Sequence, residues 1–377
     1  MRSLRLLLVL AACVVAPRAA ERAPAFQMPP AEQLGSGISY YKVDDPSYLG
    51  PDAPISARLL EVRTRDARLD LELGKGGTQG RDTVPAMAAR RGALAAVNAG
   101  FFGTNGDPAG IFKIDGLLVS DTSRPRGAVG FARPGGPPLL FDRVTARARV
   151  KAGRVTLTAT GIDTARGARA VIVYTPRFGA ATRTTGEGIE WTVEGRPLRV
   201  TAISKSAPSP IPEGGFVISA SGVIPPSLSR LRVRDRVDLS FTYATALGTP
   251  AGDWQHADDI VGGAGLLLWR GRDVRDWAEE RLALKGFVEA RHPRTLIGRD
   301  RDGDVWLVVV DGRQPGHSAG MSLPELTALS RRLGLVDALN LDGGGSSTMV
   351  VNGDVVNRPS DPTGPRPVSD AIVVLRK

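Results

Sequence analysis

The chain has 377 residues, of which 42% are hydrophobic and 23% charged, a composition typical of a folded globular protein and not of a disordered or fibrous one. Its formal net charge is +10, but the arginines are scattered along the chain and few aromatic residues lie among them. Such a charge favours attraction to polyanions in general and argues against the reading of nucleic-acid bases. A phosphate-bearing glycan or an anionic cell surface fits it at least as well.

The first 25 residues have the pattern of an export signal. Arg2 and Arg5 precede an apolar run, Leu6 to Ala16, that is too short to span a bilayer. The protein is therefore expected to be exported and to be periplasmic, secreted or lipid-anchored at the cell envelope.

Two processing routes remain open for this signal. Ala23-Pro24-Ala25 supplies the small residues that a signal peptidase prefers, whereas Leu10-Ala11-Ala12-Cys13 resembles a lipoprotein box in which Cys13 would be acylated and attach the protein to a membrane. Cys13 is the single cysteine, so neither a disulfide nor thiol catalysis is expected.

Residues 26–55 are expected to form a leader or linker, and residues 56–377 the catalytic domain. The stretch Ser56 to Leu73 alternates apolar and polar residues, which indicates a strand. A short helix is predicted over Val84 to Arg91, ending at Gly92, and a buried strand over Ala93 to Val97, ending at Asn98.

The middle of the chain, about residues 135–252, is rich in short strand-like runs separated by Gly and Pro, such as Ala170 to Tyr174 and Phe216 to Ser219. This segment is predicted to be a β-rich insertion in the catalytic domain.

The last hundred residues contain the clearest elements. Val305 to Val310 is an apolar strand that leads into Asp311, and a capping box of Ser322 and Glu325 begins a helix that ends at Gly334. A second buried strand, Val336 to Leu341, ends at Asp342, and a third covers Ala371 to Leu375. The predicted fold is therefore mixed α/β (α+β), a twisted sheet with a few covering helices.

A glycine-rich run follows the strand that ends at Asp342. Gly343, Gly344 and Gly345 leave backbone N–H groups unshielded, and the Ser346 and Ser347 hydroxyls beside them can donate to the same anion. The run lacks the lysine of a Walker loop and the spacing of a dinucleotide fingerprint. A phosphate cradle and a tight structural turn both fit this pattern.

The run belongs to a longer series of motifs that closely resembles the phosphodiester glycosidase family. The matching stretches are Ala96-Val97-Asn98-Ala99-Gly100-Phe101-Phe102, Val173-Tyr174-Thr175-Pro176, Gly214-Gly215-Phe216-Val217, His292-Pro293-Arg294-Thr295, Asp311-Gly312-Arg313, Gly320-Met321-Ser322-Leu323, Asn340-Leu341-Asp342-Gly343-Gly344-Gly345-Ser346-Ser347, Asn357-Arg358-Pro359 and Arg366-Pro367-Val368. Their order is maintained from about Ala93 to Val374.

The resemblance implies an enzyme that hydrolyses a sugar 1-phosphodiester. A phosphate leaving group needs little protonation, so cations and N–H donors can replace the carboxylic acid of ordinary glycosidases. Arg294 and the glycine run would then bind phosphate, while Asp342 or Asp311 would act at the sugar carbon. For Asp311, a plain β-turn is an equal alternative.

Three further residues are candidates for substrate binding. Asn98 would hydrogen-bond a sugar hydroxyl or acetamido group, or else cap its turn. Phe101 and Phe102 cannot both face a ligand, because neighbours in an extended chain point oppositely, and Phe102 is the candidate for an apolar wall. Arg366 lies on a Pro-rich loop that would cover the site, with surface solvation as its default role.

Other patterns favour ordinary structure. Asp300 to Asp304 contains part of a calcium-loop pattern but lacks the distant Glu, so a hairpin turn is expected. His256, His292 and His317 have no metal-ligand spacing, although His292 is placed to assist proton transfer beside Arg294. No metal site and no cofactor are predicted, and a divalent cation is left open.

Three functions fit the sequence. The leading one is an exported hydrolase acting on a phosphate-containing cell-surface or extracellular glycan. An ordinary glycoside hydrolase would need a carboxylic acid, with Asp311 as first candidate. A noncatalytic glycan-binding or polysaccharide-assembly protein becomes preferable if Asp342 and Arg294 lie far apart.

Overall fold

The computed structural model describes residues 28–131, 139–205 and 208–377, apart from residues 36, 46–48 and 50–52. The expected export signal, including Cys13, lies outside these residues. Within them, no helix combines the length and the apolar character needed to cross a bilayer.

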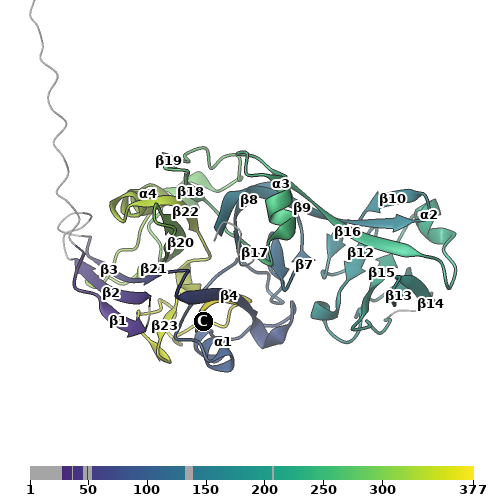
Figure 1. The fold of residues 1–377 in the computed structure, drawn as a ribbon, viewed down its shortest axis with the longest axis horizontal. Coiled ribbons are helices and arrows are strands. Elements are labelled where there is room, and N and C mark those ends of the chain that lie inside the picture. Colours follow the sequence, from purple (N-terminus) through teal and green to yellow (C-terminus); the bar gives the residue numbers. More distant parts are fainter. Residues whose placement is uncertain (1–27, 36, 46–48, 50–52, 132–138, 206–207) are drawn as a thin grey trace, which may run out of the picture.

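The described residues form four β-sheets (Figure 1), and almost every strand pairing is antiparallel. Sheet 1 has the order β1 (Glu32–Gly35), β2 (Ile38–Asp45), β3 (Ile55–Val62), β21 (Val305–Val310), β20 (Arg294–Asp300), β22 (Leu335–Asn340), β18 (Leu266–Trp269), β19 (Arg272–Asp273). Sheet 2 has the order β24 (Asp354–Val355), β23 (Met349–Val351), β5 (Ala95–Asn98), β25 (Asp370–Arg376), β4 (Ala67–Leu73).

The other two sheets contain the middle of the chain. Sheet 3 has the order β10 (Val155–Thr158), β9 (Leu139–Ala152), β8 (Thr122–Phe131), β17 (Asp259–Gly262), β6 (Phe112–Ile114), β7 (Leu117–Ser120), with β16 (Val237–Thr245) also paired to β9. Sheet 4 has the order β11 (Gly161–Ile162), β12 (Val171–Tyr174), β15 (Gly215–Ala220), β13 (Ile189–Glu194), β14 (Arg199–Ser204). The predicted β-rich insertion thus contains sheet 4, and its flanking strands β9 and β16 join it to sheet 3.

The prediction of a mixed α/β fold is wrong, because strands make up 45% of the structure and helices 13%. The strands at 305–310 and 335–340 are buried on both faces, a pattern that suggested helix-covered strands. In the structure they lie on either side of β20 and run antiparallel to it. Sheet 2 covers one of their faces and α4 (Leu323–Arg332) the other.

The segment expected to be a leader also differs from its prediction. β1 and β2 lie within residues 26–55 and continue sheet 1, because β2 pairs with β3 along its whole length. The alternating stretch 56–73 is divided between two sheets, since β3 belongs to sheet 1 and β4 to sheet 2.

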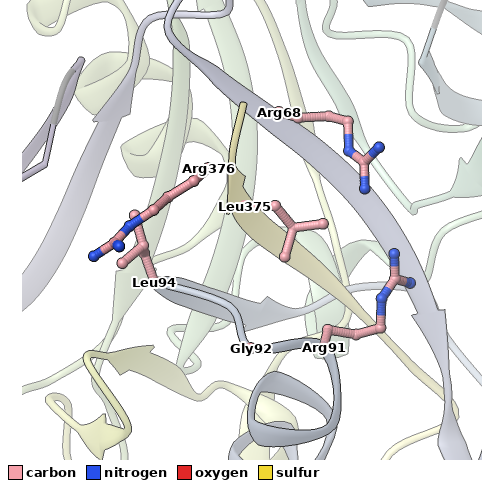
Figure 2. A pocket seen from close by; sticks show the side chains of 6 residues that line it. All are labelled: Arg68, Arg91, Gly92, Leu94, Leu375 and Arg376. Carbon is pink, nitrogen blue, oxygen red and sulfur yellow. The ribbon is translucent and has the colours of Figure 1, made fainter.

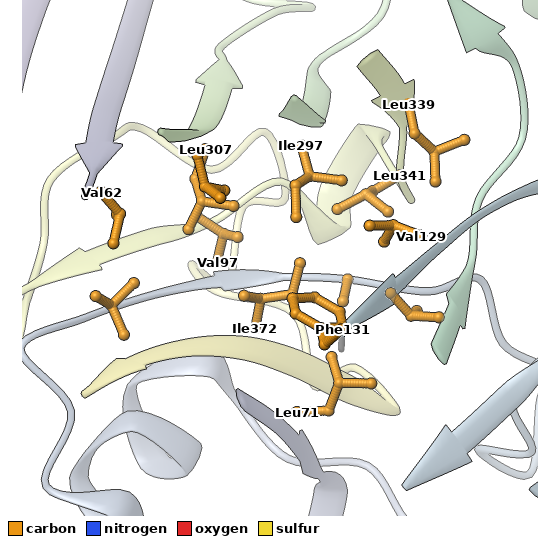
Figure 3. Packing of buried hydrophobic residues seen from close by; sticks show 14 of the residues in the cluster. Val62, Leu71, Val97, Val129, Phe131, Ile297, Leu307, Leu339, Leu341 and Ile372 are labelled. Atoms are coloured by element: carbon orange, nitrogen blue, oxygen red, sulfur yellow. The ribbon is translucent and has the colours of Figure 1, made fainter. Parts of the chain in front are cut away.

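The main hydrophobic core lies between sheets 1, 2 and 3. Figure 3 shows Leu307 and Ile297 of sheet 1 pointing toward Ile372 and Leu71 of sheet 2, with Phe131 of sheet 3 beside them. All five side chains are buried. Fully burying each such side chain stabilises the fold by roughly 1.5–3 kcal/mol, so this core holds the edges of the three sheets in fixed relation.

Two predicted helices are confirmed with their caps. α1 (Val84–Arg91) begins at Thr83, whose side chain accepts from Ala86 N, and ends at Gly92, which has φ 60°. α4 has the predicted capping box of Ser322 and Glu325. The remaining helices are short: η1 (Gly74–Gly76), η2 (Pro176–Phe178), α2 (Pro226–Ser229), α3 (Ala251–His256), η3 (Leu284–Val288) and η4 (Gly344–Ser346).

Candidate active site

The candidate site lies where the ends of strands from sheets 1 and 2 meet. β20 runs antiparallel to β21 and β22, so its first residue, Arg294, lies at the same edge as Asp311 and Asp342, which follow those two strands. Sheet 2 brings Asn98 at the end of β5 and Asp370 at the start of β25 to this edge, since Ala371 pairs with Asn98. Antiparallel pairing therefore collects residues that are far apart in sequence.

The glycine run makes a short 3-10 turn, η4, that requires glycine for two different reasons. Gly344 has φ +62°, a left-handed conformation, and a Cβ there would lie 3.1 Å from Arg313 Nη1. At Gly345, a Cβ would lie 2.1 Å from Asp361 Oδ1 and 2.2 Å from Arg366 Nη2. The turn is therefore closely covered by the side chains of two arginines.

Most N–H groups of this turn are already used within the protein. Gly343 N donates to Asp342 Oδ1 at 2.8 Å, Gly344 N to Pro293 O, Ser346 N to Gly343 O and Ser347 N to Gly344 O. Gly345 N has no hydrogen-bond partner among the described residues. A cradle of several free N–H groups, as the sequence suggested, is therefore reduced to one.

Buried hydroxyl groups complete the set of unused polar atoms. Ser346 Oγ and Thr348 Oγ1 are fully buried without a hydrogen-bond partner in the part of the chain that the structure describes, and so is Asn340 Oδ1. The Ser347 hydroxyl is also buried, and its one contact is a long one of 3.3 Å from Thr295 Oγ1 among the described residues. Buried polar groups normally have partners, so these atoms mark a place for a polar ligand or water.

Asp342 is the carboxylate of the turn and is partly exposed. The pKa of Asp342 is raised to about 6, chiefly by burial and also by the charge of Asp370, while the Ser346 hydroxyl, Gly343 N–H and Arg366 oppose the rise. The Ser346 hydroxyl acts here by proximity, because its geometry falls short of a hydrogen bond.

Asn98 is fully buried, and three of the four hydrogen-bonding positions of its side chain are used within the protein. Its Nδ2 donates to Asp342 O at 2.7 Å, and its Oδ1 accepts from Thr295 Oγ1 at 2.7 Å and Thr348 N at 3.1 Å. These bonds clamp β5 to the glycine turn, which is the structural role that the sequence left open for Asn98 beside a sugar contact.

Arg294 is 1% exposed and points away from Asp342. Its Nε donates to Met321 O at 2.8 Å and its Nη2 to Phe287 O at 2.6 Å, and its guanidinium lies over the Phe287 ring. Burial lowers the pKa of Arg294 to about 10, with the charge of Arg313 contributing. Arg294 and Asp342 are thus neighbours at the sheet edge, but no contact between their side chains joins them within the described residues.

Two other arginines occupy the place predicted for Arg294. Arg366 forms a bidentate pair with Asp361, at 2.7 and 3.0 Å, that lies directly on Gly345. The pKa of Arg366 is raised, chiefly by its hydrogen bond to Asp361 and also by the charge of Asp342. Arg313 is exposed, lies beside Gly344 and contacts His292 Nδ1 at 3.1 Å.

Asp311 is 2% exposed, and both of its carboxylate oxygens are occupied. Oδ1 accepts from Asn357 Nδ2 at 2.9 Å, and Oδ2 lies 2.9 Å from His317 Nε2 and 3.0 Å from Arg358 N. Asn357 also donates to Ser347 O. Asp311 therefore holds a neighbouring loop against the glycine turn, and its carboxylate is not presented to a ligand.

The two phenylalanines point in different directions, as expected for neighbours. Phe102 packs against the cluster around α1, which includes Val84 and Met87. Phe101 lies 6.1 Å from the Phe287 ring, which in turn covers Arg294. Phe102, the predicted apolar wall, is therefore partly buried against this cluster, and Phe101 lies on the side of Phe287 and Arg294.

Sequence reasoning missed Asp370 and gave no role to Arg313. Asp370 is fully buried, and burial raises its pKa to about 6. A carboxylate at the first position of an otherwise apolar strand was a usable signal for Asp370. Arg313 stands in the matched motif Asp311-Gly312-Arg313, but only the three-dimensional structure places it at Gly344.

The remaining titratable groups of interest lie outside this turn or are engaged otherwise. Burial and the nearby Arg294 and Arg313 lower the pKa of His292, while its Nε2 contact with Gly286 O opposes this.

In the described part of the chain, Glu61, Asp300 and Asp304 form one group with carboxylate oxygens within 4.8 Å of one another. Asp300 Oδ1 accepts from Asp302 N and Asp304 N, which confirms the predicted hairpin turn.

A basic groove of about 460 Å³ lies at the opposite end of β25 and is lined by Arg68, Arg91, Gly92, Leu94, Leu375 and Arg376 (Figure 2). Arg91 is paired with Asp70 and Glu72, and Arg68 lies 3.4 Å from Asp70. β25 has seven residues, so the groove is roughly 20 Å from Asp370. It is separate from the candidate active site.

Comparison with known proteins agrees with the motifs at the site. Mouse N-acetylglucosamine-1-phosphodiester alpha-N-acetylglucosaminidase is 38% identical over 86 residues, which cover 23% of this chain and 16% of the mouse protein. A hypothetical protein from Synechocystis has a similar structure, with a TM-score of 0.77 and 25% identity over 93% of this chain and 64% of that chain. A putative exported protein from Burkholderia pseudomallei has a TM-score of 0.71 and 25% identity, covering 86% of this chain and 74% of that one.

This chain therefore spans less than two thirds of the mouse and Synechocystis proteins that it matches. The phosphodiester glycosidase family matches residues 187–375, about half of the chain, and these residues include the glycine turn with Asp342, Arg313, Arg366 and Asp370. From this match and the structural likeness, the chain belongs to the phosphodiester glycosidase family.

Proposed function

We propose that this protein hydrolyses a glycosyl phosphodiester, with Asp342 acting at the sugar carbon and the glycine turn receiving the phosphate. One observation carries the proposal. Asp342 lies on a turn whose glycines are covered by Arg313 and by the ion pair of Arg366 with Asp361, and whose Gly345 N–H and Ser346 hydroxyl are unused.

These groups suit a phosphate leaving group. When the glycosidic bond breaks, negative charge develops on the phosphate, and guanidinium, N–H and hydroxyl donors stabilise it without a carboxylic acid. Arg366 is held in place by Asp361, so little reorganisation is needed to present its remaining donor to a ligand.

Asp342 can act at the anomeric carbon as nucleophile or as base for water only when it is ionised. Since the pKa of Asp342 is raised to about 6, the reactive form is lost as the pH falls below that value. A retaining or an inverting course is compatible with this carboxylate.

The ordinary glycoside hydrolase is less well supported, because Asp311, its candidate acid, has both oxygens occupied. The noncatalytic alternative was to be preferred if Asp342 and Arg294 lay far apart. Their side chains do not meet, but Arg366 and Arg313 supply the cations that Arg294 was expected to supply.

The activity is tested with N-acetylglucosamine 1-(methyl phosphate), a sugar suggested by the name of the mouse relative, and with methyl N-acetyl-α-glucosaminide as the phosphate-free comparator. We expect the native protein to release free sugar from the first compound only. Asp342→Asn should lower kcat by about 100-fold or more, because the amide cannot act as nucleophile or base.

The matched control is Asp302→Asn, which alters an exposed aspartate in the β20–β21 turn and should leave kcat unchanged. Turnover of the phosphate-free glycoside at an equal rate would favour the ordinary glycosidase. Saturable binding of the phosphodiester without any free sugar would favour the noncatalytic protein.

We also propose that cells export the protein, so that its substrate is a phosphate-containing glycan of the envelope or the surroundings. The apolar run after Arg2 and Arg5 supports this, and so does the description of the similar Burkholderia protein as putatively exported. The sugar and the aglycone of the natural substrate belong to that glycan.

A further inference from the structure

Asp370 contacts the backbone that leads into the site from β5. Its Oδ1 accepts from Gly100 N at 2.5 Å, its Oδ2 accepts from the Ser369 hydroxyl, and its backbone oxygen accepts from Ala99 N at 3.2 Å. The side chain is fully buried. Such a carboxylate, with an N–H donor on one oxygen and an O–H donor on the other, fixes the position of residues 99 and 100.

The same peptide group is bonded to Asp342 on its other side. Asp342 N donates to Ala99 O at 2.9 Å, and the N–H that follows this carbonyl is that of Gly100. The Ala99–Gly100 peptide therefore joins the backbone of Asp342 to the carboxylate of Asp370. Hydrogen bonds in such a chain polarise and strengthen one another.

Gly100 allows this close approach. A Cβ at residue 100 would lie 3.2 Å from Asp370 Oδ1, 3.4 Å from Asp370 Oδ2 and 3.1 Å from Val261 Cγ2. The peptide is thus packed tightly against the carboxylate, and the arrangement has little freedom to shift.

We propose that Asp370 is a positioning residue for Asp342, acting through the Ala99–Gly100 peptide and placing a second carboxyl group beside the first. The proposal rests on the role of Asp342 given above. Asp370 does not touch the substrate in this arrangement. It fixes where Asp342 stands and sets how easily Asp342 gives up its proton.

The electrostatic consequence has a definite sign. The charges that face Asp342 are Asp370, which raises its pKa, and Arg366, which lowers it and is itself paired with Asp361. Arg313 lies next to the same turn, at Gly344. Removing the negative charge of Asp370 should therefore lower the pKa of Asp342 and extend its ionised form to lower pH.

The test compares the titration of Asp342 in the full chain with that in two variants. Asp370→Asn retains an oxygen that can accept from Gly100 N but removes the charge. Ser369→Ala retains both carboxylates but removes a donor to Asp370, so that Asp370 holds its proton more tightly and Asp342 ionises first. Ser369→Ala is the smaller change and guards against a folding defect in Asp370→Asn.

Two controls alter buried side chains of the same types elsewhere. Asp142 of β9 accepts from four backbone N–H groups, and the Ser330 hydroxyl donates to Leu326 O within α4. Asp142→Asn and Ser330→Ala should lower stability without moving the titration of Asp342.

The titration is followed by carbon-13 NMR of labelled aspartate carboxyl groups, with the Asp342 signal identified by its loss in Asp342→Asn. We expect the midpoint to move downward by about half a unit or more in Asp370→Asn and in the same direction in Ser369→Ala. The acid limb of kcat/KM should move with it. An unchanged midpoint in both variants would overturn the proposal.

The NMR readout does not depend on turnover, so the two proposals can fail separately. A wild-type protein without activity on the phosphodiester, but with the expected shift of midpoint, would count against the proposed function only. An active enzyme in which neither substitution moves the acid limb of kcat/KM or the titration midpoint of Asp342 would count against the role of Asp370 only.

Discussion

At the scale of single residues, the site depends on side chains that hold its backbone as much as on those that face a ligand. Asn98 shows this most clearly, because it uses three of its hydrogen-bonding positions on Asp342 O, Thr295 Oγ1 and Thr348 N. It therefore joins sheet 2 to the glycine turn of sheet 1.

Asn98→Ala should lower the free energy of unfolding by about 1–3 kcal/mol, since it leaves buried polar groups of the turn without partners. It should also lower kcat, because Asp342 loses one of its anchors. Chemical denaturation and steady-state kinetics measure the two effects. A raised KM with unchanged stability would instead show that Asn98 contacts the sugar, and Asn105→Ala, in an exposed loop, is the control.

Residue identity predicted part of this site. Asp342, Arg366 and the glycines were predicted because polar and glycine residues at the ends of buried strands are places where sites form, and the structure brings them together at one turn. Arg294 was expected to bind phosphate with the glycine run, but the sequence does not show that its guanidinium is held by the carbonyls of Met321 and Phe287. Hydrogen-bond partners of this kind are set by packing between distant segments.

At the scale of elements, the glycine turn needs space that any side chain would take. Its third glycine, Gly345, lies against the pair formed by Arg366 and Asp361, and a Cβ there would overlap both. The absence of a side chain allows this ion pair to lie over the turn.

Gly345→Ala should displace Arg366 and reduce kcat/KM on the phosphodiester by about 10-fold or more, with a loss of stability of roughly 1–3 kcal/mol from overpacking. Gly252→Ala, in the exposed helix α3 where nothing lies within 4 Å of the new Cβ, is the matched control and should not destabilise. Kinetics and thermal unfolding of both variants measure the contrast. Equal activity in the two variants would rule out the close contact at Gly345.

The elements themselves were more predictable than their arrangement. Both α1 and α4 were predicted, with Gly92 ending the first and the capping box of Ser322 and Glu325 beginning the second, because these residues act locally. The predicted fold class was wrong because an apolar strand such as 305–310 is buried on both faces. The same sequence pattern fits a parallel sheet covered by helices and an antiparallel sheet covered by another sheet. The direction of a strand depends on its partners, which the sequence does not state.

At the scale of the whole molecule, the net charge and the expected export signal bear on the location of the protein. A net charge of +10 favours an anionic surrounding such as a phosphate-bearing envelope polymer. The two processing routes of the expected export signal would give mature chains of different mass.

Expression of the full sequence in a bacterial host should yield an exported protein, and its intact mass separates the routes. Cleavage near Ala25 gives a shortened chain without modification, whereas cleavage before Cys13 gives a chain with acyl groups. Cys13→Ala should change the mass and location in the second case only. A full-length chain retained in the cytoplasm would contradict export by either route.

The meeting of sheets 1 and 2 also has a consequence for how the protein becomes active. Asn98 and Asp342 are bonded across 244 positions of the chain, and Gly100 and Asp370 across 270. Contacts of such sequence separation are entropically costly to close and belong to the slow steps of folding. Neither sheet alone contains the residues of the candidate site, so the site is a property of the docked pair and arises only after nearly the whole chain has been brought together.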